Sequence, residues 1–132
     1  MLKIPLEPGI IKEERFTIKE EHSAKSVGSG EVKVLSTPSM IAFMEATSRD
    51  LIQPHLQAGY TTVGTRVDVR HLSPAPVGQE IIVRSELVAV DGRKLVFKVE
   101  ALWKGAKIGE GTHERYIVNL ERFLEKIRKE FI

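Results

Sequence analysis

Apolar and polar side chains alternate along several stretches of the chain, which is the period of a strand with one buried face. The first stretch covers residues 10–19, where Phe16 and Ile18 alternate with polar residues. Longer stretches predict four more strands, at residues 61–71, 80–90, 95–103 and 108–118. An Asp-Gly pair at 91–92 is typical of a tight hairpin, and residues 104–107 predict a second turn. The pattern therefore predicts a meander of long strands.

The strand at residues 61–71 has two chemically different faces. Strict alternation predicts one face made of Val63, Thr65, Val67, Val69 and His71. The opposite face carries the charges of Arg66, Asp68 and Arg70. We expect the first face to look toward a helix, which places His71 at the end of the strand beside a turn. Gly64 inside this strand predicts a bulge or a bend.

A helix is predicted to begin at Pro38, because proline is favoured at the first helical position and either Ser36 or Thr37 can cap it. Pro54 and Gly59 end the helical pattern. The first half of this helix is almost entirely apolar, so the helix is predicted to be buried. At about 3.6 residues per turn, one of its stripes contains Ile41, Glu45, Ser48 and Ile52.

A second helix is predicted from residue 119 to the end of the chain, with apolar side chains at helical spacing. The whole order is one strand, a loop of small and polar residues, a buried helix, a run of strands and a final helix. Strands that follow one another with one central helix indicate the α+β class. The length of 132 residues suits a single domain, predicted at 1–132.

Composition narrows the function. The net charge is +2 with acidic and basic residues interspersed, which argues against a nucleic-acid binder. The chain has no cysteine, which excludes a thiolate nucleophile, and its four histidines lack a metal-binding spacing, so no metal site is expected. No apolar run approaches the ~20 residues that span a bilayer, and Pro5 and Pro8 interrupt any signal-peptide core. We expect a soluble cytoplasmic protein without membrane contact.

Three side chains are candidates for chemistry. A carboxylate on an apolar helical stripe is costly to bury, and burial would raise the pKa of Glu45 toward the range of an acid–base catalyst. A buried ion pair with Arg49, four residues on, is an equally good interpretation of Glu45. His71 could complete an acid–base pair with Glu45, or it could be a satisfied core histidine. Thr37 before a proline is, taken alone, most typical of a helix cap.

Three segments, VLSTPSMIAFMEAT, TVGTRVDVRHLSPAPVG and GEGTHERYIVNLERF, resemble the fluoroacetyl-CoA thioesterase-like family of hot dog thioesterases. The resemblance runs from about Lys12 to about Phe123. It implies the hot dog fold, an antiparallel β-sheet wrapped around a central α-helix. Its catalytic threonine, glutamate and histidine correspond to Thr37, Glu45 and His71, and its glycine near the thioester corresponds to Gly64. The segment 112–115 (THER) is a further signature, which we interpret as structural.

The resemblance implies an acyl-CoA thioesterase that hydrolyses a small acyl-CoA to free acid and CoA without a cofactor. Water, Glu45 or Thr37 could be the nucleophile, with His71 as acid–base partner. On one regular helix Thr37 and Glu45 would lie about 12 Å apart, at 1.5 Å per residue, which is too far for direct contact. Hot dog proteins pair their sheets edge to edge, so we expect at least a homodimer, whose two-fold interface could assemble a composite site.

Two other functions remain open on the sequence. An acyl-thioester dehydratase also uses a histidine and a carboxylate, but it needs a substrate with a 3-hydroxyl group. A non-catalytic acyl-CoA-binding or sensing module would bind the thioester without turnover. Arginine and lysine side chains suit the phosphates of CoA, although a solvated strand face explains each of them equally well.

Overall fold

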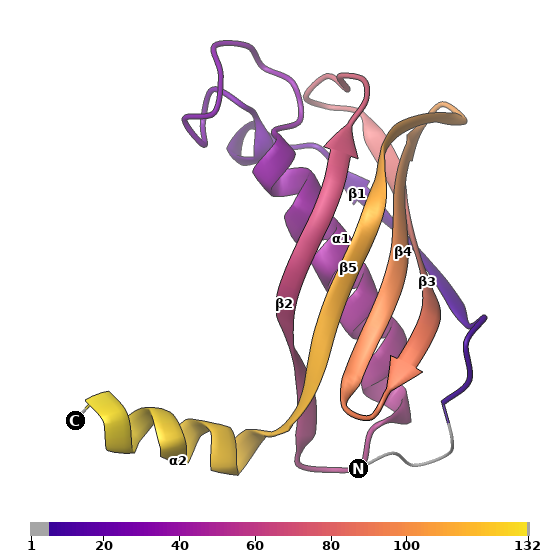
Figure 1. Cartoon of the computed structure of the whole chain (residues 1–132). Helices are drawn as coiled ribbons and strands as arrows, with labels where there is room; N and C mark the ends of the chain where they lie inside the picture. Colours follow the sequence, from indigo (N-terminus) through magenta and orange to yellow (C-terminus); the bar gives the residue numbers. More distant parts are fainter. Residues whose placement is uncertain (1–5, 132) are drawn as a thin grey trace.

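The computed structural model describes residues 6–131, which form one curved antiparallel sheet around a single long helix (Figure 1). The strands, in chain order, are β1 (Ile11–Thr17), β2 (Tyr60–His71), β3 (Glu80–Asp91), β4 (Lys94–Trp103) and β5 (Ala106–Asn119). The helices are α1 (Thr37–Ile52) and α2 (Leu120–Phe131), with short 3-10 turns η1 (Glu20–His22) and η2 (Gln53–His55). The predicted α+β hot dog arrangement and its C-terminal helix are confirmed; residues 1–5 and 132 of the predicted domain lie outside the described part.

The strands lie in the order β1-β3-β4-β5-β2, so β1 and β2 are the two edges of the sheet. All the pairings are antiparallel, as the predicted hairpins require. The turn after β4 is tighter than predicted, because only Lys104 and Gly105 separate it from β5. Both residues have positive φ, of 52° and 76°, which is the geometry of a two-residue hairpin turn.

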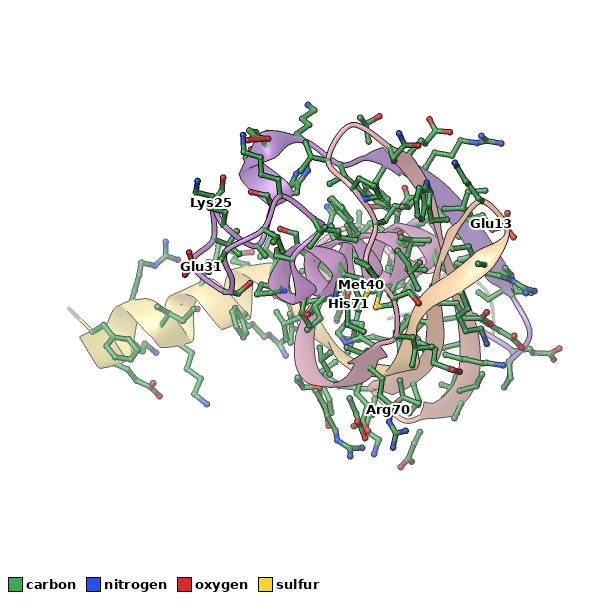
Figure 2. The ribbon with its side chains drawn as sticks, turned by 90° about the horizontal axis from the view of Figure 1, so that it is seen from above. Glu13, Lys25, Glu31, Met40, Arg70 and His71 are labelled. Carbon is green, nitrogen blue, oxygen red and sulfur yellow. The ribbon has the colours of Figure 1, made fainter. Side chains whose placement is uncertain are left out.

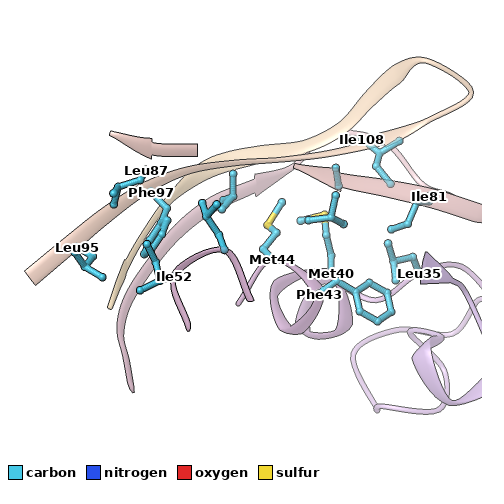
Figure 3. Packing of buried hydrophobic residues seen from close by; sticks show 14 of the residues in the cluster. Leu35, Met40, Phe43, Met44, Ile52, Ile81, Leu87, Leu95, Phe97 and Ile108 are labelled. Atoms are coloured by element: carbon cyan, nitrogen blue, oxygen red, sulfur yellow. The ribbon is translucent and has the colours of Figure 1, made fainter. Parts of the chain in front are cut away.

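The core lies between α1 and the concave face of the sheet (Figure 3). Helix α1 contributes an apolar stripe that includes Met40, Met44 and Ile52, and the sheet contributes Leu87 and Phe97. All five side chains are buried, which is the main stabilising term for an element of this length. The predicted burial of α1 is therefore confirmed for the face that contacts the sheet.

A β-bulge divides β2 into two segments. The register against β5 shifts between Gly64 and Arg66, so Thr65 is the extra residue. Before the bulge Val63 pairs with the exposed Tyr116, whereas after it Val67 pairs with the buried His113. The prediction that Val63 shares a face with Val67 is therefore wrong, because an inserted residue reverses the alternation. The prediction of a bulge or bend at Gly64 is confirmed.

Helix α2 projects away from the rest of the chain, beyond the edge formed by β2 (Figure 1). Asn119 caps it, accepting a hydrogen bond at Oδ1 from the Arg122 N–H at 3.0 Å. Its large apolar side chains are all at least partly exposed, and none of its residues is buried. Among residues 6–131 no helix is long and apolar enough to cross a membrane.

Candidate active site

The first turn of α1 separates the roles of two neighbouring hydroxyl groups. Ser36 is the N-cap, and its side chain accepts a hydrogen bond from the Ser39 N–H at 3.1 Å. Thr37 is the first helical residue, with Pro38 after it. Because Ser36 satisfies the cap, the Thr37 hydroxyl is free to contact another element. The helix N-terminus also places a partial positive charge beside Thr37.

That contact is with His71, at the end of β2. Thr37 Oγ1 and His71 Nδ1 lie 2.8 Å apart, a short hydrogen bond between a hydroxyl group and an imidazole. Burial lowers the pKa of His71, an effect that a backbone hydrogen bond with Ser73 partly offsets. A neutral imidazole is therefore favoured, and in the tautomer with its hydrogen on Nε2 the Nδ1 atom can accept the Thr37 hydrogen. The pair has the geometry of a hydroxyl group beside a general base.

The pair opens into a cleft of about 310 Å³. Two loops form the walls, and backbone hydrogen bonds join them, including one from the Leu35 N–H to the Ala75 oxygen at 2.8 Å. Figure 2 shows His71 at the open end of the sheet with Met40 beside it. The lining residues, none of which is Phe, Tyr or Trp, are Ala24, Ser29, Val34, Leu35, Ser36, Thr37, His71, Leu72, Ser73 and Pro74.

Glu45 lies two turns further along α1 and does not line this cleft. Its side chain is 41% exposed, so Glu45 is only partly buried although it lies on an apolar stripe of the helix. It faces the start of β2, where a Cβ on Gly64 would lie only 2.7 Å from Glu45 Oε2. The predicted pairing with Arg49 is wrong, because Arg49 contacts Asp50 at 3.0 Å instead. The Glu45 carboxylate can lie this close to β2 because residue 64 has no side chain.

The cationic partner of Glu45 is Arg115 on β5, whose Nη1 lies 3.9 Å from Glu45 Oε2. Arg115 is buried and donates from Nε to Thr62 Oγ1 at 2.8 Å and from Nη2 to the Thr62 carbonyl at 3.0 Å. Its Nη1 lies 3.2 Å from His113 Nε2, and His113 Nδ1 lies 2.8 Å from the Arg66 carbonyl. These bonds join β5 to β2 on both sides of the bulge.

The contacts of its two ring nitrogens, one with a carbonyl group and one with a guanidinium group, fix the protonation state of His113. Nδ1 must carry the hydrogen that it donates to a carbonyl, so Nε2 accepts from Arg115 and the ring is neutral. Burial lowers the pKa of His113, and the positive charge of Arg115 lowers it further. Sequence reasoning missed Arg115 as the partner of Glu45. The sequence did contain a signal for Arg115, because positions 113, 115 and 117 lie on the same face of the predicted strand. Ile117 on that face belongs to the core.

Within one chain the candidate residues thus form two separate groups. Thr37 and His71 contact each other at the cleft. The Glu45 carboxylate fills the space that a side chain on residue 64 would need, beside Arg115. The expected meeting of Glu45 and His71 is not found in a single chain. Among residues 6–131 no three histidine, aspartate or glutamate side chains gather into a group that could hold a metal ion.

The chain is similar to known thioesterases. The family model described as fluoroacetyl-CoA-specific thioesterase matches residues 18–121. A fluoroacetyl-CoA thioesterase from Streptantibioticus cattleyicolor is 36% identical over 97 residues, which are 74% of this chain and 70% of that protein. A solved structure of the fluoroacetyl-CoA thioesterase FlK has a TM-score of 0.91 at 27% identity, covering 98% of this chain and all of that one. A thioesterase superfamily member from Thermus thermophilus has a TM-score of 0.88 at 27% identity, covering 95% and 93%.

Proposed function

The chain belongs to the family of fluoroacetyl-CoA-specific thioesterases and is a thioester hydrolase, and from this premise we propose that it hydrolyses a small acyl-CoA to the free acid and CoA. The observation that carries this proposal is the 2.8 Å contact between Thr37 and His71 at the cleft. A hydroxyl group beside a neutral imidazole is suited to acyl transfer. The cleft volume of about 310 Å³ supports a short acyl group.

In the proposed mechanism Thr37 attacks the thioester carbonyl while His71 Nδ1 accepts the hydroxyl proton. A new C–O bond forms, the C–S bond breaks, and the CoA thiolate leaves with the proton from His71. Water then attacks the acyl ester on Thr37 with His71 again as base, the ester C–O bond to Thr37 breaks, and the Thr37 oxygen takes the proton back from His71 as the free acid leaves. The partial positive charge at the N-terminus of α1 stabilises the oxyanion of both tetrahedral intermediates.

Glu45 enters this mechanism through a homodimer. Strand β2 is a free edge of the sheet and carries Arg66, Asp68 and Arg70 on its outer face. Two copies of β2 can pair antiparallel about a two-fold axis at Val67, which places Arg66 opposite the partner's Asp68 in both directions. An axis at Asp68 would instead place like charges together. The alternating charges therefore support self-pairing with Val67 at its centre.

The same register would assemble a composite site. With Val67 on the axis and Thr65 skipped as the extra residue, Val69 lies opposite the partner's Gly64 and His71 opposite the partner's Thr62 on the same face, and adjacent strands are only about 4.8 Å apart. The partner's Gly64 is the residue over which its own Glu45 carboxylate lies. The partner's Glu45 would then lie beside Thr37 and His71, where its carboxylate can stabilise the imidazolium and orient the hydrolytic water.

Release of free thiol from acyl-CoAs tests the proposal. Acetyl-CoA, fluoroacetyl-CoA and longer saturated acyl-CoAs would be compared with wild-type protein and the variants Thr37→Ala, His71→Ala and Glu45→Gln. We expect the short substrates to react fastest and each variant to lose about 10²- to 10⁴-fold in kcat, the usual contribution of an acid–base group. Binding of acyl-CoA without thiol release would contradict the proposal and favour a binding module.

A further inference from the structure

Helix α2 carries an apolar face that the described part of its own chain leaves uncovered. Its large apolar side chains recur at helical spacing and are Leu120, Phe123, Leu124, Ile127 and Phe131. Phe131 is the most exposed, at 78%. An isolated helix of 12 residues is marginal in water, because helices of this length depend on packing of an apolar face. A partner for this face is therefore expected.

The position of α2 indicates which partner this is. Its first residue is joined to the start of β2, since the Leu120 N–H donates to the Gly59 carbonyl at 2.9 Å. From there α2 extends beyond the free edge of β2 (Figure 1) and lies, when seen from above, on the side of the sheet that α1 occupies (Figure 2). A second copy paired along β2 would occupy this space.

The register between β2 and the partner's β2 determines which part of the partner α2 contacts. With Val67 on the two-fold axis, Tyr60 at the root of α2 lies level with the partner's residue 73, because paired antiparallel positions have a constant sum that the extra residue Thr65 lowers by one. Residues 72–74 line the cleft beside Thr37 and His71. Two apolar side chains near this end of the molecule are exposed, Leu72 by 48% and Val32 by 60%. The apolar face of α2 and this apolar rim have complementary character.

We propose that α2 of each subunit docks across the partner's cleft and forms a wall of the partner's acyl-CoA site. The inference rests on the proposed function and adds a segment to that site. A hollow of about 390 Å³ at the root of α2, lined by Gly59, Leu120 and Leu124 among others, receives the partner's Leu72. With ~1.5 Å of rise per residue, α2 is about 18 Å long, enough to bring Ile127 and Phe131 over the cleft.

A paired set of variants tests the docking. Leu124→Glu/Ile127→Glu places two negative charges on the apolar face, and Arg122→Ser/Lys129→Ser makes the same charge change on the opposite face. All four side chains are exposed, so both proteins should fold. We expect kcat/KM for acetyl-CoA to fall about tenfold in the first variant, equivalent to ~1.4 kcal/mol, and the dimer to weaken in sedimentation. The control should keep wild-type values for both.

A mixed dimer tests whether α2 acts on the partner's site. One chain would carry His71→Ala with an intact α2, and the other an intact site with Leu124→Glu/Ile127→Glu. Co-expression with two different tags allows the mixed dimer to be purified. We expect it to have about half the wild-type activity, because the intact helix covers the one intact site across the two-fold interface.

The outcomes separate the inference from the proposed function. If the wild-type protein releases no thiol, the proposed function fails. If it does release thiol, but the apolar-face variant keeps wild-type kcat/KM and dimer mass, another occupant covers α2 and the inference is overturned. A mixed dimer no more active than its apolar-face parent would likewise overturn it, because α2 would then act only on its own chain.

Discussion

The first helical turn assigns two adjacent hydroxyl groups to two purposes. Ser36 caps α1, and Thr37 contacts His71 at 2.8 Å. The cap fixes the backbone from which the Thr37 side chain projects, so a rigid helix end sets the position of the proposed nucleophile.

The pH dependence of kcat/KM tests the role of His71. The imidazole must be neutral to accept the Thr37 proton, so activity falls as pH decreases through the His71 pKa. Burial lowers that pKa from its ordinary value of 6.5, whereas the partner's Glu45 carboxylate beside the ring would raise it, so we expect Glu45→Gln to shift the acid limb to lower pH. His55→Gln, at the opposite end of α1, should not move this limb. Activity that does not fall at low pH, or an acid limb that stays in place in Glu45→Gln, would contradict the assignment.

Two glycine substitutions should affect different properties: Gly64→Ala mainly the activity, and Gly109→Ala mainly the stability. Gly64→Ala would place a Cβ 2.7 Å from Glu45 Oε2, at the end of a flexible and partly exposed side chain. We expect kcat/KM to fall about tenfold, with less than ~1 kcal/mol change in the free energy of unfolding. Gly109→Ala would instead overlap the buried Met40, and we expect it to destabilise the fold by about 1–3 kcal/mol. Urea unfolding and thiol release measure both; equal stability losses would refute the distinction.

At the scale of elements, the bulge in β2 is the feature on which the site depends. It turns Gly64 and Val67 toward the same face, although their numbers differ by an odd interval. The buried bonds of Arg115 and His113 hold β5 against β2 on both sides of it. The THER segment, interpreted from sequence as structural, thus has a specific structural task in the described chain.

Removal of the Arg115 side chain tests this task. Arg115→Met deletes the donors to Thr62 and leaves the Thr62 carbonyl without that partner inside the protein. We expect the free energy of unfolding to fall by about 2–4 kcal/mol, since bonds to a charged donor are strong and an unsatisfied buried acceptor is costly. Arg15→Met removes an exposed pair with Glu80 and should cost less than ~1 kcal/mol. Similar losses in urea titrations of the two variants would contradict this role.

At the scale of the whole molecule, the open edge of β2 is the surface that most requires a partner. Its neighbour on one side is β5, and its other side is free within the described chain. Val67, on the face toward the helix, is still 37% exposed. A long unpaired edge with an exposed apolar residue is a liability that self-association removes.

A charge exchange tests the proposed register. Asp68→Arg would place two arginines opposite each other twice across the two-fold axis, and we expect the dimer dissociation constant to rise about tenfold. The double variant Arg66→Asp/Asp68→Arg restores opposite charges and should restore the dimer. Glu86→Arg, on β3, makes the same charge change away from this edge and serves as the control. Sedimentation equilibrium measures all three; failure of the double variant to recover would exclude pairing centred on Val67.

The sequence by itself determined the elements and the fold class. Alternation and helical spacing are local properties, so residues 37–52 and the five strands could be predicted from neighbours a few positions apart. The residues of the candidate site could be named for the same reason, since the resemblance depends on short segments.

Only the tertiary structure decided which of these side chains meet. Both Ser36 and Thr37 can cap a helix, and only the position of His71 on a distant strand assigns them. The bulge at Thr65 reversed the predicted face of Val63, and Arg115 on β5, not Arg49 on α1, became the partner of Glu45. The physical reason is that strand register and helix crossing depend on contacts between residues far apart in sequence, which no local period specifies.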